Sequence, residues 1–333
     1  MKGGASLART GAGCQCKIPG NSLFTLLDGA YTAVGVAEHP MQPAEDSAHL
    51  SNVPSDLLVS CDLATLVGTD STIGGRIAAL HSASDIYASG GVPLWGLSIV
   101  VLPQERTLEI GTSVLVGILE GAKMCSIAVV GGQTIYGSEP MAGMAVLGTL
   151  RSTQPMRKRS AQAGDYLYLS KPLGTSLALR ASAMHAIQQE SAEEALTVLT
   201  TSNEAASIAA VSAGVVACTD VSGFGFLGHV CQLLADGAGA TIRLTRVPVI
   251  HEVTMLPEAM FHAPWFQANL EYAQSLREVR SLLPFHELGV LLDPQTNGGL
   301  LVSTNASNSE PLVRAGFVQV GEVVSSNIVT IEY

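Results

Sequence analysis

The segment Gly11-Ala12-Gly13-Cys14-Gln15-Cys16-Lys17 holds the residue types with the most evident chemistry. Glycines expose backbone N–H groups to an anion. A neighbouring lysine lowers the pKa of a thiol and so favours the nucleophilic thiolate, and lysine also binds phosphate. Residue types alone leave three interpretations open: catalysis by Cys14 and Lys17, metal or redox binding by Cys14 and Cys16, and a flexible tail without a function. The segment lacks the Gly-Lys-Ser/Thr ending of a P-loop.

Four aspartates stand in predicted strands and helices or near their ends: Asp46, Asp62, Asp85 and Asp220. Enzymes that act on nucleotides hold Mg²⁺ with a few carboxylates together with the phosphates. Each aspartate alone is equally compatible with a helix cap, a turn or a solvated residue. Asp62 and Asp220 fit that alternative least because they end apolar strands. A magnesium site follows only if folding brings the carboxylates together.

The sequence Gly223-x-Gly225-x-x-Gly228 matches the dinucleotide-binding fingerprint and lies between a predicted strand and a predicted helix. The fingerprint also needs an acidic residue about 20 positions on. The next predicted strand ends in residues 244–247, which include no acid. A turn in which Asp220 holds Mg²⁺ fits better, with close helix packing as the alternative. Residues 131–134 and 293–299 indicate either tight turns or backbone that approaches a nucleotide.

Hydrophobic periodicity predicts the elements that must position these residues. In the first half we expect strands at 57–63, 93–102, 127–130 and 141–150, and helices at 73–85 and 108–122. In the second half we expect strands at 166–170, 241–244, 299–303 and 318–324, with helices between them. The basic, turn-rich stretch 151–164, with Arg157-Lys158-Arg159, is read as a solvated loop and domain boundary. The pattern predicts two α+β domains.

Composition excludes several classes of protein. The 333 residues carry a net charge of −11 with only 17 Lys and Arg, which argues against a nucleic-acid partner. Apolar residues make up 47%, but no apolar run approaches the roughly 20 residues of a membrane span, so no membrane partner is expected. The six cysteines are too scattered for a disulfide framework, which indicates a reducing compartment. We expect a cytoplasmic protein.

Taken together and in this order, the segments resemble the selenide, water dikinase (selenophosphate synthetase) family. The matching pieces are residues 11–17, 75–79, 84–86, 90–93, 131–134, 171–174, 219–229 and 293–299. The resemblance implies an α+β fold, the two-domain aminoimidazole ribonucleotide synthetase-like fold with a mobile Gly/Cys-rich N-terminal arm. The expected division is a catalytic arm at 1–21, an ATP- and Mg²⁺-binding, dimerising domain at 22–153, and a C-terminal α+β domain at 154–333.

The resemblance also implies a reaction, in which ATP, selenide and water give selenophosphate, AMP and phosphate. By the same resemblance Cys14 and Lys17 are catalytic, Asp46, Asp85 and Asp220 hold Mg²⁺, and the protein is a homodimer. The residues implied to contact ATP are Lys17, Asp62, Asp85, Gly132, Gln133 and Thr134. His81 stands where the family usually has Asn. Two alternatives stay open: another ATP-dependent kinase or ligase of the same superfamily, and a non-enzymatic selenium- or metal-binding paralogue.

Overall fold

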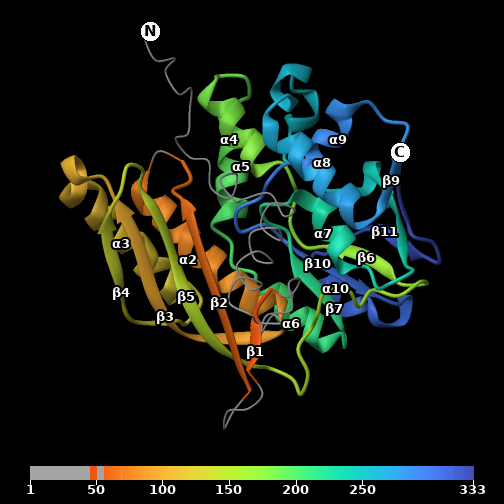
Figure 1. Cartoon of the computed structure of the whole chain (residues 1–333), viewed down its shortest axis with the longest axis horizontal. Helices are drawn as coiled ribbons and strands as arrows, with labels where there is room; N and C mark the ends of the chain where they lie inside the picture. The colour runs from red at the N-terminus through yellow and green to blue at the C-terminus, as the bar shows by residue number, and fades with distance from the viewer. Residues whose placement is uncertain (1–45, 51–55, 69) are drawn as a thin grey trace, which may run out of the picture.

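The structure is a computed structural model of the chain, and it describes residues 46–50, 56–68 and 70–333. The predicted catalytic arm, with Cys14 and Lys17, lies outside these residues. Within them the chain forms a five-stranded sheet in its first half and a seven-stranded sheet in its second half. Figure 1 shows the two sheets on opposite sides of the molecule, with α2 running between them.

The first sheet has the strand order β1-β2-β5-β3-β4, in which only β3 and β4 are parallel neighbours. Its strands are β1 (Ala48–Leu50), β2 (Leu57–Thr65), β3 (Gly91–Leu102), β4 (Ala128–Tyr136) and β5 (Met141–Leu150). Two helices, α2 (Ser71–Ala88) and α3 (Thr107–Met124), pack together on one face. Apolar residues from both layers form a single core cluster there.

Helix α2 is the element on which the site depends. It begins at Asp70, whose carboxylate accepts hydrogen bonds from the N–H groups of Thr72 and Ile73, a standard N-cap. Every residue from 77 to 84 is buried, so the helix is enclosed on all sides rather than along one stripe. Close approach to α3 needs glycine: a Cβ at Gly117 would stand 1.9 Å from the Thr72 carbonyl oxygen.

The second sheet has the order β7-β10-β6-β11-β8-β12-β9. Its strands are β6 (Tyr166–Leu169), β7 (Ala217–Asp220), β8 (Gly239–Arg243), β9 (Glu278–Ser281), β10 (Leu300–Thr304), β11 (Val318–Val324) and β12 (Ile328–Glu332). The α-helices of this half are α4 (Thr175–Ala183), α5 (Gln189–Leu199), α6 (Glu204–Ser212), α7 (Gly225–Leu233), α8 (Pro264–Leu276), α9 (Phe285–Leu292) and α10 (Glu310–Arg314). Short 3₁₀ helices lie at Gln104–Arg106, Leu244–Arg246, Val253–Met255, Glu258–Phe261 and Ala306–Asn308.

The two halves meet along α2, which packs against β7 and α6. The buried Asn203 side chain donates to Ser84 Oγ at 2.9 Å and to the Gly298 carbonyl at 2.8 Å. Ser207 Oγ donates to the carbonyl of Tyr87 at 2.7 Å. Buried polar groups need such partners, so these bonds fix α2 against the second half.

The predicted two-domain α+β fold is confirmed. Two details of the element prediction are wrong. The glycines at 131–132 do not form a turn, because β4 continues through them to Tyr136. A Cβ at Gly132 would lie 2.1 Å from the Ser98 carbonyl oxygen, so glycine here permits close strand pairing. The short strands β1, β9 and β12 were not predicted. The domain division at 153/154 falls between β5 and β6 and stays a prediction.

Candidate functional site

Three of the predicted aspartates converge. Asp46 lies two residues before β1, Asp85 lies in the last turn of α2, and Asp220 ends β7. One carboxylate oxygen of each lies within 4.8 Å of the others. Folding therefore brings together residues that are up to 174 positions apart in the sequence. Carboxylates from three elements at this spacing can hold a cation such as Mg²⁺, which prefers oxygen ligands.

Neighbouring hydroxyl groups orient two of the carboxylates. Ser60 Oγ, on β2, donates to Asp85 Oδ2 at 2.5 Å. Thr219 Oγ1 donates to Asp46 Oδ1 at 3.2 Å. The third carboxylate differs, because Asp220 Oδ2 is buried and has no hydrogen-bond partner among the described residues. A buried carboxylate oxygen without a partner is costly unless a cation binds it, so the cluster fits a divalent metal.

The site includes a buried lysine that the sequence did not predict. Lys158 Nζ lies 2.5 Å from Asp46 Oδ1, and its side chain is 8% exposed. The interpretation of residues 151–164 as a solvated loop is therefore wrong at Lys158. The run Arg157-Lys158-Arg159 gives no signal that its middle residue points inward, since only the fold supplies its carboxylate partner.

Burial and charge act against each other in this cluster. Burial raises the pKa of Asp46 to about 7; the Lys158 ammonium lowers it, and the Asp220 charge raises it. Burial lowers the pKa of Lys158, but the carboxylates of Asp46, Asp85 and Asp220 together outweigh burial, and the net effect is a raised pKa. The cluster is thus a negatively charged site with one cation, the Lys158 ammonium, already beside it.

The turn after Asp220 is held by α7. The Ser222 N–H donates to His229 Nε2 at 3.0 Å. Gly225 adopts φ +69°, and a Cβ there would lie 2.8 Å from the Leu292 carbonyl carbon. The glycines thus serve a tight turn, as predicted. Three strands separate β7 from β8, so this is not the adjacent-strand unit of a dinucleotide-binding fold.

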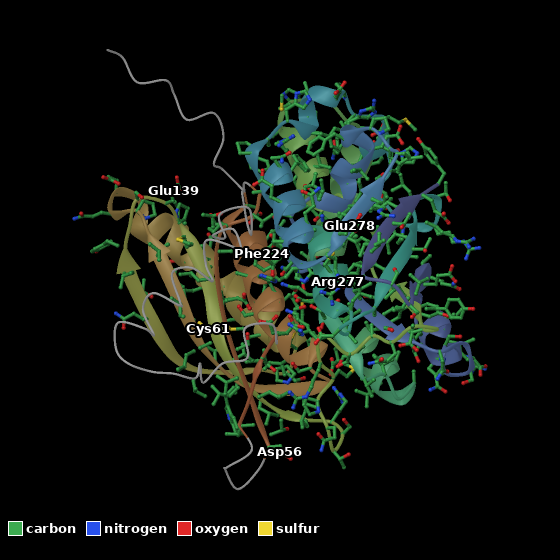
Figure 2. All side chains as sticks on the ribbon, turned by 45° about the vertical axis from the view of Figure 1, so that its right-hand side comes forward. Asp56, Cys61, Glu139, Phe224, Arg277 and Glu278 are labelled. Atoms are coloured by element: carbon green, nitrogen blue, oxygen red, sulfur yellow. The ribbon has the colours of Figure 1, made fainter. Side chains whose placement is uncertain are left out.

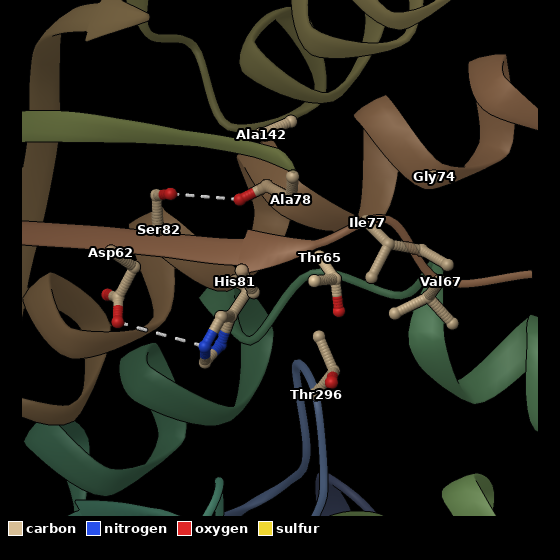
Figure 3. Close-up of a pocket in the computed structure, with 11 residues that line it drawn as sticks. Asp62, Thr65, Val67, Gly74, Ile77, Ala78, His81, Ser82, Ala142 and Thr296 are labelled. Atoms are coloured by element: carbon tan, nitrogen blue, oxygen red, sulfur yellow. Dashed lines mark hydrogen bonds and ion pairs between the residues drawn. The ribbon is translucent and has the colours of Figure 1, made fainter. Parts of the chain in front are cut away.

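The fourth aspartate lies in a small pocket next to the cluster, where α2 meets the second half (Figure 3). Asp62, on β2, faces His81 of α2, with 3.8 Å between Asp62 Oδ1 and His81 Nε2. His81 Nδ1 accepts a hydrogen bond from the Asn297 N–H at 3.3 Å. Thr296 completes the rim of the pocket from the same loop of the second half.

Lysine 171 anchors the loop that carries Asn297. Its Nζ donates to the Asn297 carbonyl at 3.0 Å and to the Thr201 carbonyl at 2.7 Å. Burial lowers the pKa of Lys171 to about 7, while the charge of Asp220 acts in the opposite direction. Residues 293–299 therefore form a loop in which every residue is buried and which is held against α2.

The remaining predicted residues are not brought to this cluster. Gly132, Gln133 and Thr134 are exposed on β4, the edge strand, and β3 and β5 separate β4 from β2. Cys14 and Lys17 lie outside the described residues. The described chain thus assembles the predicted metal ligands and Asp62, and leaves the predicted nucleotide contacts of β4 on another part of the sheet.

Comparison with known proteins identifies the family. The family models for AIR synthase related proteins match residues 45–150 (N-terminal domain) and 162–333 (C-terminal domain). The selenide, water dikinase of Myxococcus xanthus is 34% identical over 309 residues, covering 91% of this chain and 88% of that protein. The chain belongs to the selenide, water dikinase family. The selenide, water dikinase of Desulfitobacterium hafniense (strain Y51) is 30% identical, in an alignment that covers 98% of this chain and 97% of that protein.

Solved structures agree on the fold of this dikinase family member. Thiamine monophosphate kinase from Aquifex aeolicus is 17% identical, with a TM-score of 0.69 over 93% of this chain and 95% of that one. The hydrogenase maturation protein HypE, solved in complex with ATP, is 15% identical, with a TM-score of 0.62 over 88% and 87%. In the described part of the dikinase chain, no helix is both long and apolar enough to cross a membrane.

Proposed function

We propose that the protein makes selenophosphate from selenide, ATP and water and releases AMP and phosphate. The observation that carries the proposal is the cluster of Asp46, Asp85 and Asp220, with its open, buried Asp220 oxygen. Family membership supplies the substrate, because the relatives that cover most of the chain are named selenide, water dikinase.

Asp46, Asp85 and Asp220 would hold Mg²⁺, which neutralises the charge of the ATP phosphates that repels an anionic nucleophile. Ser60 and Thr219 keep two of these carboxylates in place through their hydroxyl groups. Fixed ligands reduce the reorganisation needed when nucleotide binds, so these hydroxyls support the site without touching substrate.

Cys14 and Lys17 complete the proposed site from the N-terminal arm. We place Lys17 beside the phosphate under attack, where its ammonium offsets developing charge. Cys14 would bind or position selenium, a role that suits a thiolate next to a lysine. Both assignments rest on the family resemblance of residues 11–17, and the substitutions below test them.

We further propose a homodimer built on the open face of the first sheet. The face opposite α2 carries large apolar side chains that are 37% to 63% exposed: Leu63, Trp95, Leu97, Val130 and Ile135. Cys61, labelled in Figure 2, is also exposed on β2, two residues before Leu63 and therefore on the same face of the strand. Apolar patches of this kind mark interfaces. If a second copy covered this face, the exposed residues 132–134 of one subunit could contact the nucleotide bound by the other subunit.

The dimer is tested by sedimentation of Leu97→Asp. A charge at the centre of the face should shift the protein from dimer to monomer. The matched control is Leu119→Asp, because Leu119 is 55% exposed on α3, on the other side of the sheet. If Leu97→Asp and Leu119→Asp both stay dimeric, the dimer does not use this face.

A cytoplasmic location also belongs to the proposal. The four described cysteines, Cys61, Cys125, Cys218 and Cys231, are all free thiols. Free thiols persist in reducing compartments.

The function is tested with purified protein, ATP, Mg²⁺ and selenide. AMP should form in step with selenophosphate, and neither should form without selenide. ADP as the final nucleotide, or AMP at an equal rate without selenide, would contradict the dikinase reaction. Cys14→Ala separates the alternatives: it should abolish selenophosphate synthesis, whereas another kinase or ligase of the superfamily would keep its turnover. Metal or selenium binding without any nucleotide turnover would favour a carrier protein.

A further inference from the structure

The aspartate cluster has two unlike ends. At one end, Asp46 Oδ1 already accepts from Thr219 Oγ1 and lies 2.5 Å from Lys158 Nζ. At the other end, Asp220 Oδ2 is buried and has no hydrogen-bond partner in the described part of the chain. The first oxygen is occupied by a cation and a hydroxyl, and the second is available. A cation that enters the cluster therefore meets one filled position and one open position.

The formal charges support the same division. Three carboxylates carry −3, and the Lys158 ammonium carries +1, which leaves −2 for the cluster with its lysine. One divalent cation balances that charge. The charge of Lys158 acts on all three aspartates, with Asp46 nearest and Asp85 and Asp220 further away. A buried ammonium is stable only when it is paired, so Lys158 belongs to the cluster and is not a solvated neighbour of it.

Geometry keeps a second metal ion away from the Lys158 end. A magnesium ion bonds its oxygen ligands at about 2.1 Å, and the ammonium already stands against Asp46 Oδ1, one of the two oxygens that this carboxylate offers. An ammonium and a divalent ion on the same carboxylate oxygen also repel each other strongly in a buried site. A second metal ion at this end would therefore have to compete with Lys158 for the Asp46 carboxylate.

We propose that Lys158 fills one cation position of the aspartate cluster, so that the protein without nucleotide binds a single divalent ion, on the Asp85–Asp220 side. The inference rests on the metal site of the proposed function and adds a specificity residue to it. Lys158 sets how many metal ions the cluster accepts before ATP arrives. Removing its charge opens the Asp46 end to a second ion.

The test counts Mn²⁺ ions, a paramagnetic probe for Mg²⁺, by the electron paramagnetic resonance signal of free Mn²⁺ at pH 8 without nucleotide. Cluster sites are those that disappear in Asp220→Asn. Wild type should bind one ion per chain in the cluster. Lys158→Gln and Lys158→Met should bind two, and Lys158→Arg, which keeps the charge, should bind one.

The matched control is Arg159→Gln. It removes the same charge from the next residue, whose side chain is 61% exposed and pairs with Asp236. It should bind one ion, as wild type does. Melting curves establish that each variant is folded. Lys158→Gln and Lys158→Met are both included so that the test can still be made if one of them does not fold.

A count that stays at one in Lys158→Gln and Lys158→Met overturns the inference, whatever the affinity, and leaves the metal site standing. If wild type and Asp220→Asn bind the same number of Mn²⁺ ions, the cluster is not a metal site, and both the proposed metal site and the inference about Lys158 are refuted. A second ion in Arg159→Gln would also refute the role of Lys158, because net charge alone would then explain the change.

Discussion

Asp293 begins the buried loop that holds Asn297 against His81, and its charge has a measurable cost. Burial raises the pKa of Asp293 to about 7, although hydrogen bonds from the Leu177 N–H and the Gln295 side chain oppose this. In the unfolded chain the same carboxyl group loses its proton near pH 4. Between these two pH values the folded state binds one proton more, so stability falls as pH rises.

The size of this effect follows from the pKa values. The raised pKa destabilises the folded state relative to the unfolded chain by roughly 2 kcal/mol at pH 5, where the folded carboxyl keeps its proton, and by roughly 4 kcal/mol at pH 8, where it is ionised. Asp293→Asn removes this cost at every pH. The amide oxygen keeps the hydrogen bonds from Leu177 and Gln295, while the amide NH₂ loses one acceptor interaction, with the Ser176 N–H, worth about 1 kcal/mol at any pH. The advantage of the variant over wild type should therefore grow by roughly 2–3 kcal/mol from pH 5 to pH 8.

Urea unfolding at pH 5, 6, 7 and 8 measures this difference, because other titrating groups are common to both proteins and cancel. Asp236→Asn is the matched control: its carboxylate is 82% exposed, so its difference from wild type should stay nearly constant with pH. Parallel curves for wild type and Asp293→Asn would refute the reasoning, since they would mean that the buried carboxyl titrates as it does in the unfolded chain.

Three further outcomes are expected. Saturating Mg²⁺ should raise the melting temperature of wild type by about 5 °C and leave Asp220→Asn unmoved, while Asp236→Asn responds as wild type does; an equal response in Asp220→Asn would exclude the cluster as the metal site. Asn203→Ala should lower the free energy of unfolding by about 2 kcal/mol, because the Ser84 hydroxyl and the Gly298 carbonyl lose their buried donor, and an unchanged urea midpoint would contradict this. Gly117→Ala should lower the free energy of unfolding, measured by heat, by about 2–4 kcal/mol, because its Cβ would meet the Thr72 carbonyl oxygen. Gly131→Ala on the exposed strand should lower it by less than about 1 kcal/mol, and equal effects would contradict the helix packing.

Elements with a clear apolar pattern could be predicted from the sequence. The strand at 57–63 and the helix at 73–85 match β2 and α2, because alternation and the glycines at 90 and 91 mark them. The length of β4 could not be predicted, since its glycines are typical of a turn and only pairing with β3 keeps them extended. The strands β1 and β9 hold too few apolar residues for a periodic signal, and β12 forms through parallel pairing with β8 and β9, which the sequence does not reveal.

The site shows the same division between local and long-range information. Residue types indicated four aspartates as candidate metal ligands, and the family resemblance implied that Asp46, Asp85 and Asp220 are the ligands among them. The distances between them could not be derived from spacing, because they come from the packing of α2 against β7. Lys158 was missed for a physical reason: a lysine in a basic run is normally solvated, and the carboxylates that stabilise it inside, Asp46 above all, reach it only in the fold.

The burial of α2 on all sides has a consequence for how the molecule unfolds. One side of the helix belongs to the core of the first half, while Ile77 packs with Leu199 and Ala88 with Ala210 from the second half. Loss of the second half would leave apolar side chains of this helix in water and strip Ser84 of its partner. The free energies of the two halves are therefore coupled, and heat or denaturant should melt them in one cooperative step, with no surviving N-terminal fragment for a protease to release.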